Sequence, residues 1–394
     1  MNNQHKILII PSWYPPDGGY FFKEHSESLY DMGWQVDVLV TRMVGIRKLF
    51  RFGLSALHRY RSRNENGLHV FRSVFLKIPG NERINIRRRT SHIFRKFKKY
   101  EQLHGKPALI LAHSVTWAGY AAWLIHKDFN IPYIIVEHRS YFVWSTEEAR
   151  KLIKPYYLSY FEKAYRNCYR IVLVSGSQLK GLKALFPWIE EKTMVIPNMI
   201  REDMFLPPSV PRKTEPFIFC WAGRMEHVKG LDILLKAVQI LKNRSGTRFS
   251  VRLAGRGTLK NVLLQMTKDL ELDDRVHFLG RLSREEMQTE MQDSNCFVLP
   301  SRYEAFGIVL IEAMATGLPV IATRSGGPDT IVTRECGLLI ETENSLQLAE
   351  AMERIINDYS DYSPKKIRAL TIEQYGQTNV MKQYDQLFMH LLKK

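Results

Sequence analysis

Short runs of apolar residues recur along the chain, and segments with helical periodicity separate most of them. Runs that are apolar throughout, without alternating polar positions, are typical of strands buried on both faces of a parallel sheet. Strands that alternate with helices favour an α/β fold. The expected strands are residues 6–10, 35–41, 108–112, 133–136, 170–174, 193–196, 217–222, 249–254, 276–280, 295–300 and 318–323.

Proline interrupts this alternation at one place. Residues 204–216 contain four prolines and no hydrophobic period, and the strand pattern restarts after them at Phe217. Such a composition is typical of a linker. A chain of 394 residues is long enough for two domains, each with its own core. We therefore predict two α/β domains connected through this segment.

The most informative stretch is residues 300–323, PSRYEAFGIVLIEAMATGLPVIAT, which connects two expected strands. Gly307 to Ala315 is expected to be helical, and Gly317 is suited to end the helix. A strand–helix–strand unit places the helix N-terminus at the carboxyl edge of the sheet, where open α/β sheets bind ligands. The free N–H groups from Gly307 to Val309 can hold an anion there.

Two glutamates flank the start of this helix. In a continuous helix Glu304 and Glu312 would lie about 12 Å apart along the axis. Carboxylate pairs that act on one glycosidic bond lie closer, at roughly 5–9.5 Å. The spacing instead suits two separate hydroxyl contacts along an extended ligand with a diphosphate in the middle. An isolated pair of this kind would more often be ordinary surface acids of an amphipathic helix.

Two cations follow the expected strand 217–222. Gly223-Arg224 and Lys229-Gly230 both fall in the loop at its carboxyl end. A guanidinium offers a planar fork and an ammonium a compact charge, and both suit a diphosphate. The loop 11–19 has the matching place in the first half of the chain. It lacks G-x-G-x-x-G, so dinucleotide binding is not supported.

Together these motifs resemble the retaining nucleotide-sugar glycosyltransferases of family 4, also called glycosyl transferases group 1. The resemblance rests on EAFGIVLIEAMATGLPVI with its two glutamates separated by seven residues, on G-R-x4-K-G, and on VEHRS at residues 136–140. The sequence IPN at 196–198 resembles the family's hinge, although Met199 stands where a glycine is usual. The resemblance covers almost the whole chain.

This resemblance implies the GT-B architecture, an α/β fold with two Rossmann-like domains that face each other across a cleft. Residues 1–203 plus 376–394 are expected to form the acceptor-side domain, and residues 204–375 the nucleotide-sugar-binding domain. The tail, residues 371–392, is expected to be helical and to cross back onto the first domain.

The resemblance also implies roles for individual residues. Arg224 and Lys229 neutralise the donor diphosphate, Glu304 holds hydroxyls of the donor sugar, Glu312 holds the ribose, and His138 contacts the sugar from the other domain. His113 is expected to be structural. The remaining expected donor-binding residues are Gly18, Gly19, Gly223, Gly255, Leu279, Gly280, Arg281, Ala305, Phe306, Gly307, Ile308 and Val309. The sequence contains no Asp-x-Asp motif, and neither a divalent metal nor a cofactor is expected besides the nucleoside-diphosphate sugar.

The formal net charge of +17 indicates an anionic partner. Basic residues gather in Arg42–Arg63 and Arg83–Lys99, where apolar residues recur at helical spacing. Such segments bind anionic membrane surfaces or lipid-linked acceptors, bind nucleic-acid phosphates, or form the solvated faces of ordinary helices. No nucleic-acid-binding motif accompanies them, so nucleic acid is the least favoured of the three.

Four widely spaced cysteines, without the spacing of metal ligands, predict buried thiols in a reducing compartment. The opening residues predict a first strand and no signal peptide, and no run of 18 apolar residues predicts a membrane span. The expected location is the cytoplasm, with peripheral attachment to the inner face of the cell membrane as an option.

The predicted function is transfer of a sugar from a nucleoside-diphosphate sugar to a glycan or lipid-linked saccharide, with retention of anomeric configuration, in the synthesis of cell-surface polysaccharide. Retention is implied by the family alone. Two alternatives stay open: a nucleotide-sugar epimerase of the same fold, since fold does not decide function, and a non-catalytic basic scaffold on a membrane surface.

Overall fold

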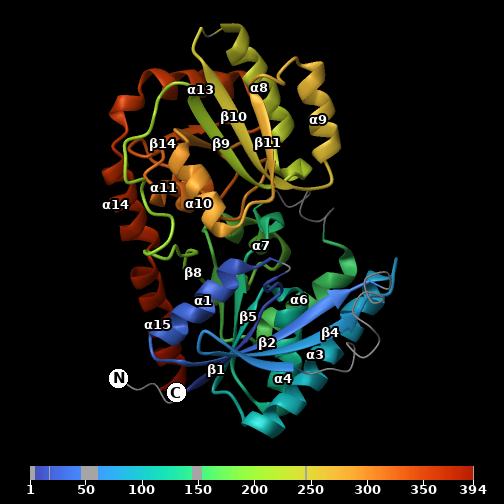
Figure 1. The fold of residues 1–394 in the computed structure, drawn as a ribbon. Helices are drawn as coiled ribbons and strands as arrows, with labels where there is room; N and C mark the ends of the chain where they lie inside the picture. Colours follow the sequence, from blue (N-terminus) through green and yellow to red (C-terminus); the bar gives the residue numbers. More distant parts are fainter. Residues whose placement is uncertain (1–4, 17, 46–60, 144–152, 245, 394) are drawn as a thin grey trace. The chain divides into compact units, whose positions relative to one another are not determined.

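A computed structural model describes residues 5–16, 18–45, 61–143, 153–244 and 246–393 of the chain. The chain folds into two compact units (Figure 1). Unit 1 comprises residues 1–196 and 381–394, and unit 2 comprises residues 197–380. Each unit is a parallel α/β layer structure, as the alternation of apolar runs and helical segments predicts.

The sheet of unit 1 has the strand order β3-β4-β2-β1-β5-β6-β7-β8, and only its edge pair β3–β4 is antiparallel. Its strands are β1 (Lys6–Ile10), β2 (Gln35–Val44), β3 (Arg61–Glu65), β4 (Leu68–Leu76), β5 (Leu109–His113), β6 (Tyr133–Glu137), β7 (Arg170–Leu173) and β8 (Thr193–Val195). The order reverses between β1 and β5, so that the loops after these two strands meet at a topological switch point.

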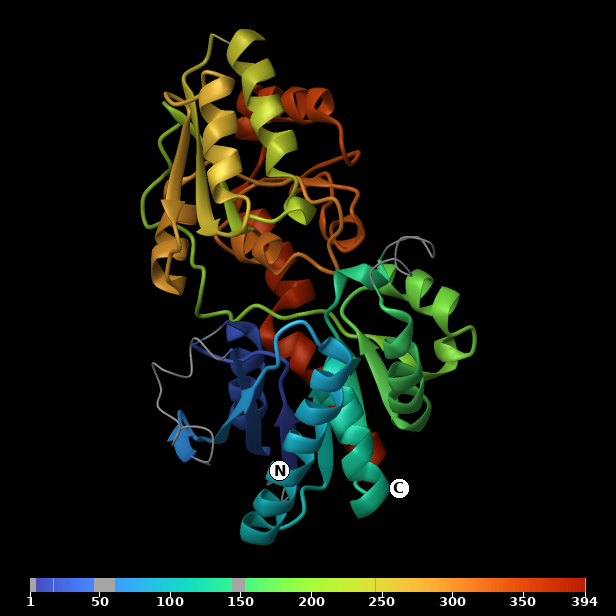
Figure 2. The ribbon, with the colours of Figure 1, turned by 90° about the vertical axis from the view of Figure 1, so that its right-hand side faces the viewer.

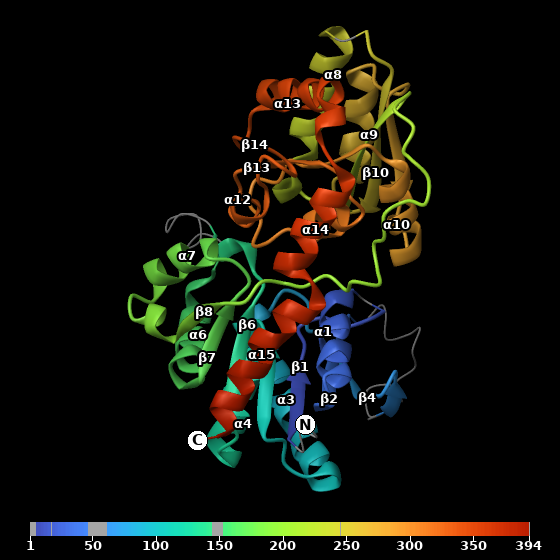
Figure 3. The ribbon, with the colours of Figure 1, turned by 90° about the vertical axis from the view of Figure 1, so that its left-hand side faces the viewer.

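Helices cover both faces of this sheet (Figures 2 and 3). They are α1 (Tyr20–Asp31), α3 (Glu82–His104), α4 (Tyr120–Phe129), α6 (Pro155–Asn167), α7 (Ser177–Leu185) and the unit 1 part of α15 (Gln377–Leu392). On one face α1 packs beside α15, where Trp34, just beyond α1, donates a hydrogen bond of 3.0 Å to Asp385. On the other face α3, α4 and α6 bury aromatic side chains such as Phe97 and Phe161 in one core.

The sheet of unit 2 has the order β11-β10-β9-β12-β13-β14, and all its pairings are parallel. Its strands are β9 (Phe217–Arg224), β10 (Phe249–Arg256), β11 (Val276–Gly280), β12 (Cys296–Leu299), β13 (Val320–Thr323) and β14 (Gly337–Ile340). Its helices are α8 (Leu231–Arg244), α9 (Lys260–Asp269), α10 (Arg284–Asp293), α11 (Ile308–Ala315), α12 (Pro328–Ile331), α13 (Ser345–Asn357) and α14 (Pro364–Tyr375). The order reverses between β9 and β12.

The strands expected from the apolar runs are all present, with ends that differ by at most three residues. The expected helix 307–315 is α11, preceded by Gly307 in a left-handed conformation. The expected helical tail is two helices, because Gly376 pairs with Ile200 and the N–H of Gln377 donates to the carbonyl of Ile200. The four cysteines are buried and form no disulfide.

The interpretation of residues 204–216 as a linker between domains needs correction. These residues lie within unit 2, and the chain leaves unit 1 earlier, after Ile196. Arg212 donates hydrogen bonds to the carbonyls of Gln292 at 3.1 Å and Thr316 at 2.7 Å, and Asn295 donates to the carbonyl of Lys213 at 2.8 Å. Side chains therefore attach a segment without helix or strand structure to the unit 2 core.

The two basic segments have different outcomes. The helical spacing in Arg42–Arg63 was predicted from apolar positions between residues 46 and 57, which lie outside the described residues, so it stays a prediction. At the two described ends of the segment, residues 42–44 belong to β2 and residues 61–63 to β3. Arg83–Lys99 is helical, within α3, but its Ile86, Ile93 and Phe97 are buried in unit 1. The apolar face of α3 thus belongs largely to the protein core.

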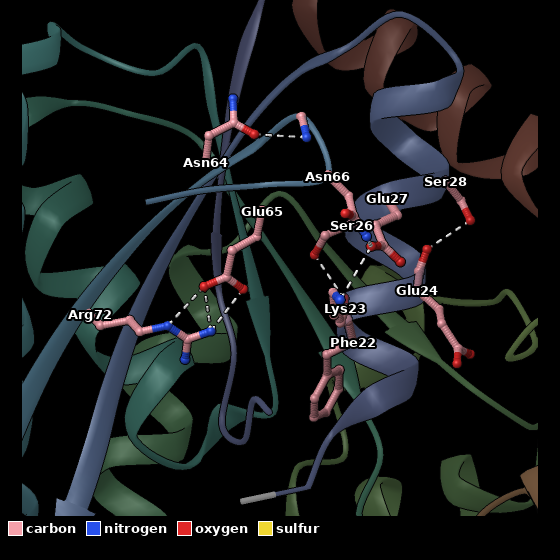
Figure 4. A network of polar contacts seen from close by, with 11 residues as sticks. Phe22, Lys23, Glu24, Ser26, Glu27, Ser28, Asn64, Glu65, Asn66 and Arg72 are labelled. Atoms are coloured by element: carbon pink, nitrogen blue, oxygen red, sulfur yellow. Dashed lines mark hydrogen bonds and ion pairs between the residues drawn. The ribbon is translucent and has the colours of Figure 1, made fainter. Parts of the chain in front are cut away.

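The strand pair β3–β4 was missed in the sequence, although a turn signal marks it. Asn66 has a positive φ of 52°, and Gly67 donates its N–H to the Asn64 side chain at 2.9 Å (Figure 4). An Asn-Gly pair is a typical two-residue hairpin connection. The pair supports the loop 11–19, since Arg72 of β4 binds both Glu65 oxygens at 2.9 Å and donates to the Pro15 carbonyl at 2.8 Å.

No helix in the described ranges is both long and apolar enough to cross a membrane.

Candidate functional site

The candidate site of unit 2 lies at the carboxyl edge of its sheet, where β9 and β12 are neighbours. The loop after β9 carries Arg224 and Lys229, and the loop after β12 carries Glu304 and leads into α11. Because chain connections run away from each other at this point of strand reversal, the two loops are left side by side with space for a ligand.

An ion pair joins the two loops. Lys229 Nζ lies 2.5 Å from Glu304 Oε2, and both side chains are largely buried, with 19% and 15% of their surfaces exposed. Gly230, which follows the lysine, has a φ of +63°, and a Cβ there would lie 1.9 Å from the carbonyl oxygen of Pro300. Only glycine therefore allows the loop after β9 to approach the end of β12 this closely.

Glu304 is also fixed through its backbone. Its N–H donates to the carbonyl of Ser325 at 2.9 Å, and its carbonyl accepts from the N–H of Gly327 at 2.8 Å. The loops after β12 and β13 are therefore joined as a short parallel bridge between Glu304 and Gly326. The backbone of Glu304, whose carboxylate lies beside Lys229, is therefore fixed by hydrogen bonds between these two loops.

The helix α11 begins at Ile308, four residues after Glu304, and Gly307 is its N-cap. Gly307 has φ 100° and ψ 56°, a left-handed conformation that turns the chain into the helix and that L side chains rarely adopt. Ile308 and Val309 are partly buried, while Ala305 and Phe306 are buried, with the Phe306 ring 5.6 Å from that of Tyr375. This helix start offers backbone N–H groups and a positive dipole end.

Glu312 occupies a different environment from Glu304. It lies inside α11, only 4% exposed, and forms an ion pair with Arg284 of α10. The guanidinium of Arg284 also lies 4.7 Å from the Phe205 ring centroid. The two glutamates thus have separate cationic partners, which agrees with the expectation that they do not act on one atom. Arg284 was missed in the sequence.

Other expected donor-binding residues line the same edge. Gly223 and Arg224 at the end of β9 pair in register with Gly255 and Arg256 at the end of β10. Leu279 and Gly280 end β11, the next strand, and Arg281 follows them. The Arg224 side chain is exposed and forms no ion pair with any residue in the described ranges. Its role at a diphosphate stays a prediction.

Arg302 is a second residue that sequence reasoning missed. Its guanidinium binds Asp232 of α8 through two hydrogen bonds of 2.9 and 2.7 Å, pairs with Glu343, and donates to the carbonyl of His227 at 2.6 Å. These hydrogen bonds raise the pKa of Arg302, Asp232 contributing most. Its own N–H donates to the carbonyl of Val228 at 2.8 Å. Arg302, in the loop after β12 that contains Glu304, therefore connects this loop to the loop after β9 that contains Lys229.

We expect Arg302→Met to destabilise unit 2, because it leaves Asp232 and the His227 carbonyl without their donor. Hydrogen bonds to charged groups contribute about 1.5–3 kcal/mol each, and the partial exposure of Asp232 places the expected loss near the lower value. Urea unfolding measures the loss, with Arg324→Met as control, since Arg324 is half exposed and its ion pairs are longer. Equal stability of the two variants would contradict the role of Arg302.

Unit 1 places three histidines together at its own switch point. His113 Nδ1 lies 3.1 Å from His138 Nε2, and the rings of His25 and His113 are 5.4 Å apart. Burial lowers the pKa of His25 to about 4 and of His138 to about 3, and lowers that of His113 well below its usual value. All three imidazoles are therefore neutral at neutral pH.

The glycine pair of unit 1 lies beside this cluster. Gly19 ends the loop 11–19 and precedes α1. The ring centroid of Phe22 in that helix lies 4.5 Å from that of His113, at a tilt, and 4.9 Å from that of His138, edge-on. The sequence predicted His113 as structural, and its burial and its contact with His138 fit that role. Contact of His138 or Gly18 with a donor stays a prediction.

Across the described ranges, no three His, Cys, Asp or Glu side chains are grouped as a metal site would require.

Two family models match successive parts of the chain. The model described as Glycosyltransferase Family 4 matches residues 19–203, and the model described as Glycosyl transferases group 1 matches residues 204–373. The chain belongs to glycosyltransferase family 4. The two matches cover most of both units of this family 4 glycosyltransferase. They include the loop after β9 with Arg224 and Lys229, both glutamates and the three clustered histidines.

Known relatives extend the comparison. The family 4 chain is 25% identical over 367 residues to the putative teichuronic acid biosynthesis glycosyltransferase TuaC of Bacillus subtilis, covering 89% of this chain and 88% of TuaC. The first two curated relatives match over shorter stretches, and the chain spans only 59% and 62% of their lengths.

Solved structures have the same fold. A sucrose-phosphate synthase from Thermosynechococcus elongatus superposes with a TM-score of 0.81 at 22% identity, covering 98% of this chain and 99% of that one. Anabaena HepE in complex with UDP-glucose superposes with a TM-score of 0.73 at 18% identity, covering 98% of this chain and 100% of that one. The family 4 chain therefore has the GT-B fold.

Proposed function

We propose that this protein transfers a sugar from a nucleoside-diphosphate sugar to a glycan or a lipid-linked saccharide, with retention of anomeric configuration, in cell-surface polysaccharide synthesis. The observation that carries the proposal is the Lys229–Glu304 pair at the switch point of unit 2, beside the N-terminus of α11. HepE, a structural neighbour, was solved with UDP-glucose, which supports this class of donor. TuaC, named for teichuronic acid biosynthesis, supports the cell-surface role.

The first step in the proposed mechanism is exchange of partners at Lys229. The donor diphosphate binds the ammonium of Lys229 and the opening N–H groups of α11, and Arg224 folds over it from the end of β9. Glu304, released from the lysine, accepts hydrogen bonds from hydroxyls of the donor sugar. Both partners of the broken ion pair therefore regain a partner when the complete donor binds, so neither charge stays buried and unpaired.

The same groups assist departure of the nucleotide. As the bond between sugar and diphosphate lengthens, negative charge increases on the leaving oxygen. Fixed positive charges therefore stabilise the transition state more than the ground state. Two cations and a helix dipole can supply this stabilisation, so we propose that the reaction needs no divalent metal. Glu312, held by Arg284, accepts hydrogen bonds from the ribose. Neutral His138 contacts the donor sugar.

Membrane attachment is a separate part of the proposal. The solvent face of α3 carries Arg83, Arg87, Lys98 and Lys99, and an anionic inner membrane surface would attract it. Since the apolar face of α3 packs in unit 1, attachment would be electrostatic and would weaken as salt concentration rises.

A thermal-shift screen tests the donor class. We expect one nucleotide among UDP, GDP, ADP and dTDP, and its sugar, to raise the melting temperature, since a ligand that binds only the folded state stabilises it by about 2.7 kcal/mol at 100 times its Kd. Lys229→Ala should abolish the shift. Lys236→Ala, an exposed lysine on α8, is the matched control.

Product analysis then separates transferase from epimerase. With the selected donor and an acceptor extract, we expect label from the sugar to appear in a larger saccharide. An epimerised sugar with no labelled acceptor would contradict the proposed function, and so would the absence of a shift with every nucleotide.

A further inference from the structure

Arg89 of α3 is a buried cation with few partners. Its side chain is 3% exposed, and its guanidinium stacks on the Trp117 ring at 3.8 Å. Nη2 lies 3.5 Å from the Ser12 carbonyl and 3.4 Å from the Thr41 carbonyl, both long for hydrogen bonds, and Nε has no partner. No acidic residue of the described ranges pairs with it. A buried charge without a counter-charge costs free energy, so this site calls for an explanation.

Arg139 is a second cation with few partners, and it is only partly buried. It follows His138 at the end of β6, and its guanidinium lies 5.1 Å from the Trp13 ring and 5.6 Å from the Tyr141 ring. Its Nε is buried and has no hydrogen-bond partner, and it forms no ion pair with a described residue. Burial lowers the pKa of Arg89 to about 9, and the charge of Arg139 adds to this effect.

A closed series of contacts brings the two arginines together. Arg89 contacts Ser12, and Arg139 contacts the next residue, Trp13. On the other side Arg89 stacks on Trp117, whose neighbour Thr116 lies 3.4 Å from the hydroxyl of Tyr141, which Arg139 contacts. Both guanidiniums therefore lie at the carboxyl edge of unit 1, between the loops after β1, β5 and β6.

The buried carboxylate nearest in sequence, Glu137, is bound by other donors. Glu137 Oε1 accepts hydrogen bonds from the N–H of Val115 at 2.5 Å and from the hydroxyl of Tyr165 at 3.0 Å. Burial raises the pKa of Glu137 to about 7, against the hydrogen bond from Val115 and the charge of Arg139, so it is partly protonated at neutral pH. It forms no ion pair with Arg89 or Arg139.

We propose that Arg89 and Arg139 bind a phosphate group of the acceptor. This inference rests on the proposed function and specifies its acceptor as a phosphorylated one. Guanidiniums bind phosphate oxygens through paired N–H groups. The loop after β5 also contains the hydroxyl of Ser114, which is buried and has no hydrogen-bond partner. The phosphate supplies the counter-charge that the folded protein does not.

Calorimetric titration of inorganic phosphate into the Lys229→Ala protein tests the site directly. This background removes the main cation of the donor site, so we expect the remaining phosphate binding to depend on unit 1. Adding Arg139→Gln should weaken it at least tenfold. Adding Arg95→Gln, which removes an exposed charge from α3, should change it less than twofold. Equal effects of the two glutamine substitutions would overturn the proposal, as would loss of all phosphate binding in Lys229→Ala alone.

Arg89→Lys gives a second test that retains the charge. It should fold, since the ammonium keeps the cation near Trp117, but it loses the fork and should weaken phosphate binding at least threefold. If it binds phosphate as tightly as the background protein, Arg89 is a structural cation and the proposal fails.

Transfer kinetics separate this inference from the proposed function and identify the source of the phosphate. With a polyprenyl-diphosphate saccharide or a soluble sugar phosphate as acceptor, Arg139→Gln should raise the acceptor KM at least tenfold for whichever is used, with the donor KM unchanged. An unchanged acceptor KM would overturn the phosphate site and leave the transferase intact. Absence of transfer to any acceptor by the unmodified protein would instead overturn the proposed function.

Discussion

We expect Lys229→Ala to lower turnover by about 10²–10³-fold, the loss typical when one fixed donor to a developing negative charge is removed. Lys229 is the largely buried ammonium at the switch point, and its closest described partner is the carboxylate of Glu304 at 2.5 Å. In the variant the diphosphate keeps the α11 N–H groups but loses the charge that balances the leaving nucleotide. Steady-state kinetics with the identified donor and acceptor measure the effect.

The variant should remain folded, because the lysine belongs to a short turn, His227–Lys229, outside the hydrophobic core. Circular dichroism and the melting temperature check this. Lys236→Ala is the kinetic control, since its side chain lies exposed on α8. Lys229→Ala with the turnover of the unmodified protein would refute the role assigned to the lysine and would remove the main support for the transferase proposal.

The second large effect concerns pH. We expect unit 1 to lose stability as the pH falls below about 6.5, because the unfolded chain then binds protons at His25, His113 and His138 that the folded unit does not. For His25 alone, a pKa lowered from 6.5 to about 4 corresponds to about 3 kcal/mol, present above pH 6.5 and fully lost near pH 4. His92, with a pKa lowered to about 4, acts in the same direction.

Glu137 acts in the opposite direction. Its pKa is raised to about 7, so the folded unit binds the extra proton, and this contribution is present at low pH and lost as the pH rises through about 7. Between pH 4.5 and 6.5, this contribution of Glu137 offsets about as much stability as one histidine loses. The net expectation is a fall in stability on acidification.

Hydrogen exchange at pH 7.5 and 5.5 can measure this effect separately in each unit. Amides of unit 1 should lose protection, after correction for the intrinsic rate, while unit 2 serves as the internal control. His25→Phe should reduce the dependence by up to about 1.4 kcal/mol per pH unit, the value for one proton. Equal pH dependence of the two units would show that the histidines do not control stability.

Much of the fold could be predicted from the sequence because buried parallel strands are apolar throughout. Runs such as 109–112 and 296–299 are recognisable without knowledge of their neighbours. The edge strand β3 and its neighbour β4 were missed for the same reason, since Arg61, Arg63 and Arg72 interrupt their apolar pattern. The linker was misplaced because proline content shows that a segment lacks regular structure but not which core it packs against.

The candidate site was predictable where local sequence determines the geometry. Gly230 and Gly307 sit where a close approach or a positive φ requires glycine, and the charged residues beside them are fixed by these turns. The partners of the two glutamates could not be predicted, because Lys229 and Arg284 come from elements distant in sequence. The unpaired Arg89 could not be recognised either, because the segment Arg83–Lys99 contains seven other basic residues and the sequence does not distinguish Arg89 from them.

The salt bridge between Lys229 and Glu304 has a consequence for the order in which ligands leave. A nucleoside diphosphate that has lost its sugar satisfies the ammonium but offers the carboxylate nothing. The carboxylate of Glu304 then competes with the nucleoside diphosphate for Lys229. Re-formation of the ion pair thus promotes release of the nucleoside diphosphate after each turnover. We expect the protein to bind the intact donor for longer than it binds the nucleoside diphosphate.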